Sequence, residues 1–263
     1  NDTATTEIYT ILFVGSVRLY KRQRYDVKPR LGIRFSLPMS ILLFIGLLVI
    51  SPLLLFIFLV LVSIGIQPLL ALTLTLGSLL TSYVNIMIAE VTYYMPFTPF
   101  TDLMKFFPIP IIIQRIDKLF LEVNVGGAVI PIVISIYLIT EYLMKSAVVI
   151  VVFISSLAIS SLIIWQSSRI IPNIGITLPT SLPVLLTLIF TLIATTLLHA
   201  NPLAFSYSLG SLSTLLGADI LNMKRVIRSM RGYVSIGGAG VFDGIYITSL
   251  MSLILASLYR VLL

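Results

Sequence analysis

The amino-acid sequence predicts an all-α integral membrane protein with about seven transmembrane helices. Of its 263 residues, 58% are hydrophobic and only 10% are charged, whereas globular domains carry about 25% charged residues. The mean hydropathy of +1.11 agrees with this class. A soluble fold of this length needs more polar surface than 17 Lys and Arg and 10 Asp and Glu residues can supply. The composition therefore excludes a soluble enzyme.

The predicted helices follow from the apolar runs, because a transmembrane helix needs about 20 predominantly apolar residues. Seven runs satisfy this requirement: 37–64, 66–91, 122–142, 146–166, 178–198, 202–223 and 235–259. The first run contains Pro38 and Pro52, which either kink a helix or lie in its first turn. We therefore expect a transmembrane helical domain over 37–263, preceded by a cytoplasmic N-terminal segment over 1–36.

Two segments outside these runs have a different pattern. Residues 8–35 combine β-branched and aromatic residues in partial alternation around a polar centre, KRQRYDVKPR, which predicts a short cytoplasmic β-hairpin. Residues 92–121 mix aromatic residues, prolines and a few charges. This composition is typical of a segment at the level of the lipid headgroups, anchored by its aromatic side chains.

The distribution of basic residues predicts the orientation in the cell membrane. With seven spans, 15 of the 17 basic residues fall on the side of the N-terminus, and only Lys145 and Arg260 fall on the other side. Basic residues concentrate in cytoplasmic loops of multi-pass membrane proteins. We therefore expect a cytoplasmic N-terminus and an external C-terminus.

The residue types that are scarce or absent narrow the chemistry. The chain has no cysteine and one histidine, so the sequence predicts no metal site and no cofactor. His199, in LLHANP between two apolar runs, is expected to lie at the membrane interface. The net charge of +7 is explained by the membrane topology, so nucleic acid is not expected as a partner. The expected partners are the lipid bilayer and either a second copy of the chain or a membrane complex.

Three sequence patterns occur twice in the same order and predict an internal repeat. They are LGIRFSLP at 31–38 with IGITLPTSLP at 174–183, LGSLLTSYVNI at 76–86 with LGSLSTLLGADI at 209–220, and NVGGAVIP at 124–131 with SIGGAGVF at 235–242. The halves, 31–142 and 174–263, then pair predicted helices 1–3 with 5–7, and the helix at 146–166 connects them. Halves four spans apart share one orientation, which describes a parallel repeat.

Two acidic residues lie within predicted spans, Asp219 in LLGADILN and Asp243 in GAGVFDGIY. An ionisable residue at membrane depth is costly, so it faces a protein interior or a hydrated cavity and often marks an ion path, a proton relay or a catalytic group. The structural alternative is that each carboxylate accepts backbone N–H groups or pairs with Lys224 or Arg225 and only stabilises helix packing.

Glycine pairs form the second feature that points to a site. Gly126-Gly127 and Gly237-Gly238 lie near the start of predicted helices 3 and 7. Broken helices at such positions line substrate or ion sites in transporters, whereas glycine also permits close helix packing. The predicted ion- or solute-binding residues are Asn85, Asn124, Gly126, Gly127, Asp219, Gly237, Gly238 and Asp243, with Glu90 and Glu122 nearer the cytoplasmic mouth.

Several of these segments resemble those of a known protein family. The segments LGSLSTLLGADILN and SIGGAGVFDGIYITSL, with NVGGAVIPIVISIYL and SYVNIMIAEV upstream, resemble an uncharacterised family of archaeal and bacterial polytopic membrane proteins, a domain of unknown function. The similarity covers about 60–260 and includes both glycine pairs, Asp219, Asp243 and Gly244. The resemblance implies a membrane protein without an established activity.

Three functions remain open from the sequence. The first is passage of a small solute or ion through a polar site between the repeat halves, with Asp219 and Asp243 binding a cation or a proton. The second is an intramembrane aspartyl protease in which these two acids form a catalytic dyad, although the flanking residues differ from those of presenilin-type proteases. The third is a non-catalytic membrane scaffold or accessory subunit.

Overall fold

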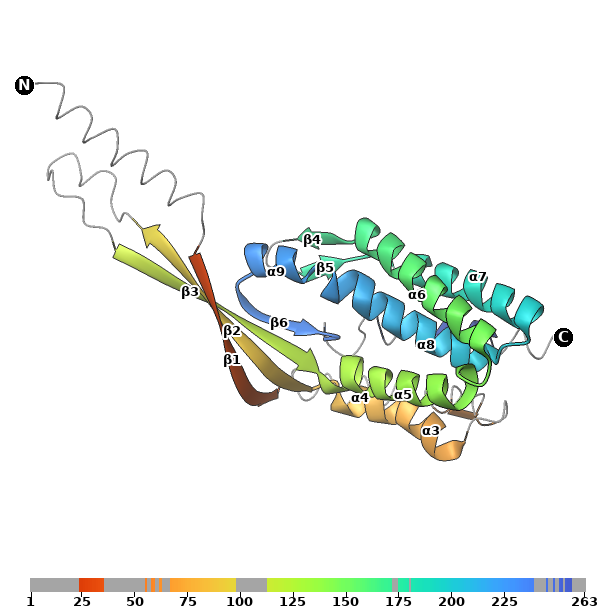
Figure 1. Cartoon of the computed structure of the whole chain (residues 1–263). Helices are drawn as coiled ribbons and strands as arrows, with labels where there is room; N and C mark the ends of the chain where they lie inside the picture. Colours follow the sequence, from red (N-terminus) through yellow and green to blue (C-terminus); the bar gives the residue numbers. More distant parts are fainter. Residues whose placement is uncertain are drawn as a thin grey trace, which may run out of the picture.

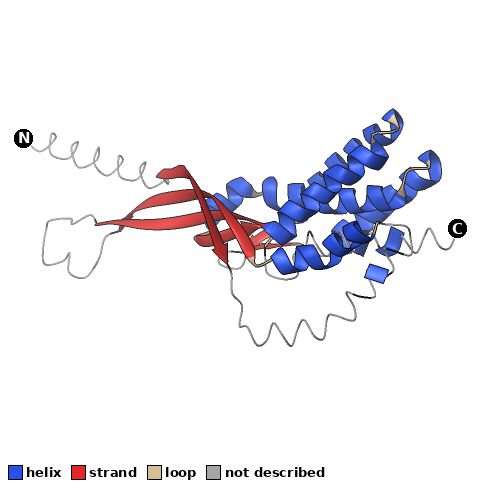
Figure 2. Cartoon of the chain, turned by 90° about the horizontal axis from the view of Figure 1, so that it is seen from below, coloured by secondary structure: helices blue, strands red, loops and turns tan. Residues whose placement is uncertain are grey.

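The protein has two parts, a helical bundle and a long twisted sheet that extends from one end of it (Figures 1 and 2). The computed structural model describes residues 24–35, 67–97, 113–171, 175–179 and 181–238, with single helical positions within 55–62 and 245–256. Both termini of the chain lie outside these ranges.

Three of the described helical segments are composite, because π-helical turns (η) continue their α-helices. Their bounds are α3 Pro68–Leu72, η1 Thr73–Gly77, α4 Ser78–Thr81, η3 Val125–Val129, α5 Ile130–Leu138, η4 Ile139–Leu143, α6 Ala147–Ser167, α7 Ser181–Leu198, α8 Pro202–Thr214, η5 Leu215–Ile220 and α9 Met223–Ser229. Turns of π-helix are rare in proteins and occur frequently at functional sites.

Among the described residues, three helices are long and apolar enough to cross a bilayer: Val125–Leu143, Ala147–Ser167 and Ser181–Leu198. They coincide with the predicted runs 122–142, 146–166 and 178–198, and they indicate a membrane protein. Local chemistry sets their ends. His199 has a φ of 52°, which interrupts the helical path after α7, and the Asn201 side chain accepts hydrogen bonds from the backbone N–H groups of Leu203 and Ala204.

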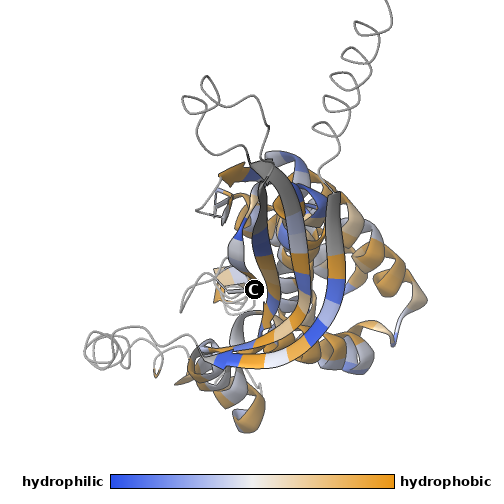
Figure 3. Cartoon of the chain, turned by 90° about the vertical axis from the view of Figure 1, so that its left-hand side faces the viewer, coloured by the Kyte–Doolittle hydropathy of each residue, from blue (hydrophilic) through white to orange (hydrophobic). Residues whose placement is uncertain are grey.

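The interior of the bundle combines an apolar core with buried serine and threonine side chains, and its exterior is apolar. Its central helix, α8, is buried continuously from Leu203 to Ser211 and packs against α5, α6 and α7. On α6, the side chains of Ser156, Ser160 and Ser161 are buried, whereas Ile154, Ile159 and Leu162 are exposed. Many residues along the helices are hydrophobic (Figure 3), and large apolar side chains such as Val151, Leu185 and Leu197 are exposed. This arrangement suits a bilayer, where helices associate through small and hydroxyl-bearing residues.

The main sheet contains the strands β1 Arg24–Phe35, β2 Val84–Phe97, β3 Ile113–Asn124 and β6 Gly232–Ile236 in that order. Neighbours are antiparallel except for β3 and β6, which are parallel. A second sheet joins β4 Arg169–Ile171 to β5 Gly175–Thr177. One face of the main sheet packs against α9, burying the clustered side chains of Val91, Tyr93, Leu119, Leu121, Val226 and Met230.

The four-stranded sheet corrects the expectation of an all-α protein. In the predicted span 66–91, the helix ends at Thr81 and β2 begins at Val84. The interface segment predicted over 92–121 instead contributes the paired strands β2 and β3 in its described part. These residues are apolar because the strands bury one face on α9. Hydropathy alone does not separate such strands from membrane helices.

Two further boundaries differ from the sequence prediction. Within the hairpin predicted for 8–35, the described part forms β1, which pairs with β2 more than 50 residues away along the chain. The alternation of residues identifies a strand but not its partner. In the predicted span 202–223 the helix ends at Ile220, and in 235–259 the first residues belong to β6. Most of the remainder of that last run lies outside the described residues.

Charged side chains connect the strands on the other face of the sheet. Arg34 donates to both carboxylate oxygens of Glu122, at 2.7 and 2.6 Å, and this interaction raises the pKa of Arg34. Glu90 pairs with Arg30 and Lys118, each at 2.6 Å, and hydrogen bonds from Lys118 and then Arg30 lower the pKa of Glu90. The Glu122 side chain is fully buried, whereas that of Arg34 is 36% exposed.

This difference in burial predicts an asymmetric effect of mutating the pair. Arg34→Gln should lower the free energy of unfolding by about 2–3 kcal/mol, because it leaves the buried Glu122 carboxylate without its partner. Glu122→Gln should cost less, because the partly exposed Arg34 still reaches water. Thermal unfolding in detergent measures both effects, with Arg30→Gln as a control that removes one exposed ion pair. A larger loss for Glu122→Gln than for Arg34→Gln would contradict the prediction.

Candidate functional site

The sheet and the bundle meet at a buried polar cluster, here called the joint, formed by Asn85, Asn124, Gly127, Ser235 and Gly237. Asn124 ends β3 and caps η3, where its side-chain oxygen accepts from the Gly127 N–H at 2.8 Å. Its amide nitrogen donates to Asn85 Oδ1 at 2.9 Å and to the Ser82 carbonyl at 2.5 Å. Ser235 Oγ on β6 donates to the same Asn85 oxygen at 2.8 Å.

The two glycine pairs cross at the joint. A Cβ atom placed on Gly127 would lie 1.7 Å from the Gly237 carbonyl oxygen, so only glycine permits this approach. Gly237 has a φ of 71°, which is strained for other residues. Asn85 and Asn124 are 3% and 1% exposed. The joint is therefore tightly packed, and the glycines serve close contact there rather than lining an open path between the two pairs.

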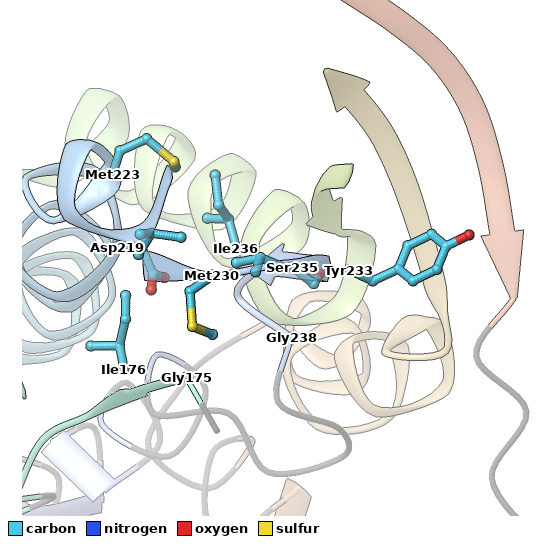
Figure 4. A pocket seen from close by; sticks show the side chains of 11 residues that line it. Gly175, Ile176, Asp219, Met223, Met230, Tyr233, Ser235, Ile236 and Gly238 are labelled. Carbon is cyan, nitrogen blue, oxygen red and sulfur yellow. The ribbon is translucent and has the colours of Figure 1, made fainter. Parts of the chain in front are cut away.

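A cavity of about 170 Å³ lies beside the joint and shares Ser235 with it, and Gly238, the residue after Gly237, also lines the cavity (Figure 4). At the liquid volume of about 30 Å³ per molecule, this space corresponds to roughly five waters. Asp219 is the acidic residue of its lining. The other lining residues are Gly175, Ile176, Met223, Val226, Met230, Tyr233, Val234 and Ile236.

Asp219 lies in η5, in the last turn before the chain leaves the bundle. Asn222 ends this helix, because its amide nitrogen donates to the carbonyls of Gly217 and Ala218 at 3.1 and 3.0 Å. Gly217 packs closely on α6, where an added Cβ would lie 2.6 Å from the Ser161 carbonyl oxygen. The backbone that carries Asp219 is therefore fixed from both sides.

The structure brings most of the predicted site residues into one region. Asn85, Asn124, Gly127 and Gly237 form the joint, Gly126 is buried beside it, and Gly238 and Asp219 line the cavity. Glu122 and Glu90 lie on the sheet in ion pairs. Asp243 lies outside the described residues.

Two residues with clear roles were missed by the sequence reasoning. Ser235 connects β6 to the joint, and Asn222 ends the helix that carries Asp219. The sequence held a signal for each. Ser235 occupies in SIGG the position that Asn124 occupies in NVGG, and Asn222 follows Asp219 by three residues in GADILN.

The arrangement defines what chemistry the cavity can support. One carboxylate in a largely apolar lining suits binding of a small cation or a polar solute with a positive group. Within the described part of the chain, no three His, Cys, Asp or Glu side chains come together as a metal site. The described cavity also holds no second acidic residue that would form a dyad with Asp219.

The fold and the site define a class: a membrane protein whose helical bundle joins a four-stranded sheet, with a carboxylate-containing cavity near their junction. The chain belongs to the family described as "Protein of unknown function (DUF1614)", whose model matches residues 79–255. This confirms the resemblance to an uncharacterised family. A search of curated proteins and a search of solved structures each found no match.

The glycine crossing predicts a sharp difference between two alanine substitutions. Gly127→Ala should prevent folding or lower the melting temperature by more than about 10 °C, since the new methyl group overlaps a backbone carbonyl at 1.7 Å. Gly32→Ala on β1 is the control, because its nearest neighbour would lie at an ordinary 3.8 Å. Thermal unfolding in detergent compares the variants, and equal stability of Gly127→Ala and the unmodified chain would contradict the crossing.

Proposed function

We propose that this protein passes a small cation or a small positively charged solute across the membrane, with Asp219 as the binding group. The observation that carries the proposal is the position of Asp219 in the lining of a cavity next to the joint. A carboxylate at a membrane boundary is retained at a cost, and binding a cation gives it a function.

The geometry supports a positioned binding group. Asp219 is carried by a π-helical turn that is ended by Asn222 and packed on α6 through Gly217. The opposite part of the cavity is formed by Ser235 and Gly238, which the joint holds in place. A group supported in this way loses little freedom on binding, which favours affinity.

The proposal also includes seven spans, a parallel repeat and a cytoplasmic N-terminus. Its support is that β3 and β6 lie next to each other in parallel, and that each strand leads directly into a glycine pair. The segment after the first pair is the helix Val125–Leu143, and the segment after the second contains helical positions such as Ile245 and Thr248. In this interpretation the residues that line the cavity belong to the second half, and the joint beside it combines residues of both halves.

Flux through reconstituted liposomes tests the function. We expect the unmodified protein to dissipate an imposed gradient of at least one of four probes: K⁺, Na⁺, H⁺ or methylammonium. Asp219→Asn should lower that flux at least tenfold, because it removes the charge and keeps the shape. Asp117→Asn on β3 is the matched control, since it makes the same chemical change outside the cavity and should leave the flux unchanged.

Two results would overturn the proposal. One is the absence of flux above empty liposomes for all four probes with folded protein. The other is equal flux for the unmodified protein and Asp219→Asn. Cleavage of a membrane peptide that is lost in both Asp219→Asn and Asp243→Asn would instead assign the aspartyl protease function, because a dyad needs both acids.

A further inference from the structure

A group of exposed basic side chains lies at the end of the bundle near the sheet. This basic platform comprises Lys224, Arg225 and Arg228 on α9 and Arg169 on β4, all exposed. The elements α9 and β4 contact each other. The other face of α9 is buried, with Val226 at 2% and the adjoining Met230 at 6% exposure, in the cluster that covers the sheet. The short helix therefore holds its charges on a fixed surface.

The platform is placed where the apolar part of the bundle ends. Helix α6, one of the three candidate membrane spans, ends at Ser167, two residues before Arg169. Trp165 in its last turn lies under Arg225, with the guanidinium carbon 5.1 Å from the centre of the ring. Tryptophan is enriched at the interface between membrane and water. This contact places the level of the lipid headgroups at the platform.

Few acidic residues lie near the platform residues in the sequence. No aspartate or glutamate occurs between Glu141 and Asp219 or between Asp219 and Asp243. Asp219 itself lines the cavity. On the sheet, Glu90 pairs with Arg30 and Lys118, and Glu122 pairs with Arg34. The platform thus keeps a net positive charge at the depth of the headgroups.

We propose that the basic platform binds the headgroups of anionic phospholipids, such as phosphatidylglycerol. Phosphate oxygens accept charge-assisted hydrogen bonds from guanidinium and ammonium groups. A phospholipid whose chains lie along the apolar surface of α6 brings its phosphate to the height of Arg169 and α9. Four cations at one level favour lipids with a net negative charge over zwitterionic lipids, in which the headgroup carries its own cation.

Lipid retention by the purified protein tests the proposal. The protein is equilibrated in micelles with equal amounts of phosphatidylglycerol and phosphatidylcholine, and native mass spectrometry counts the lipids that remain bound. We expect preferential retention of phosphatidylglycerol. The double variant Lys224→Gln/Arg228→Gln should lower this preference about thirtyfold, since each basic residue near the headgroups contributes a factor of about five. Neither side chain lines the cavity.

The control variant also removes one lysine and one arginine, but at positions outside the platform. Lys145→Gln/Arg30→Gln changes a lysine at the opposite end of α6 and an arginine on the sheet, and it should keep the phosphatidylglycerol preference. Equal retention of the two lipids by the unmodified protein overturns the proposal. So does an equal loss of preference in both double variants, because that result reflects net charge alone. Arg169→Gln supplies an independent platform variant if the first pair lowers the melting temperature.

Discussion

The structure depends on one hydrogen-bonded side chain, the amide of Asn124. It belongs to a strand and caps the helix that follows, and it connects both to the end of α4 and to β6 through Ser82, Asn85 and Ser235. Buried polar groups are costly unless they are paired, and pairing of several at once fixes a unique arrangement. The amide can make these bonds only where the backbones approach closely, which is the reason for glycine at positions 127 and 237. The sheet is therefore attached rigidly to the bundle and not by a flexible linker.

Buried polar side chains also hold the helices of the bundle together. In a bilayer the hydrophobic effect does not hold helices together, because lipid is as apolar as the side chains. The close contacts come from small and hydroxyl-bearing residues on α8 and its neighbours, for example Ser135 and Ser211, whose hydroxyl oxygens lie 2.6 Å apart. Apolar side chains remain on the outside, where lipid surrounds them. On α6 and α7 the buried face carries serine or threonine side chains while the exposed face is apolar, the reverse of a helix in a soluble bundle.

The sequence predicts an element of the fold correctly where a single residue property, such as hydropathy, determines that element. Runs of about 20 apolar residues located the helices at 125–143, 147–167 and 181–198, because a bilayer imposes that length. The same criterion wrongly included the first half of β2 in the predicted span 66–91, because alternate residues of this strand are apolar where one face packs on α9. The site shows the same division. Polar residues and glycines in apolar surroundings identified Asn85, Asn124 and Gly127, but the crossing of Gly127 with Gly237 depends on strand pairing between distant segments, which composition does not reveal.

The proposed cation site and the basic platform act on an approaching cation in opposite ways. Asp219 attracts the cation and the platform repels it, and anionic lipid bound to the platform would neutralise the repulsion. Asp219 lies five residues before Lys224, the first cation of α9. Unneutralised, the platform would repel a cation approaching the cavity, because charges within about 10 Å interact at physiological salt. Anionic headgroups on the platform would cancel this repulsion and leave the carboxylate as the dominant charge at the cavity. Cation passage would therefore depend on the lipid site, because bound anionic lipid favours entry of a cation. The lipid site does not depend on cation passage, since it requires neither Asp219 nor flux.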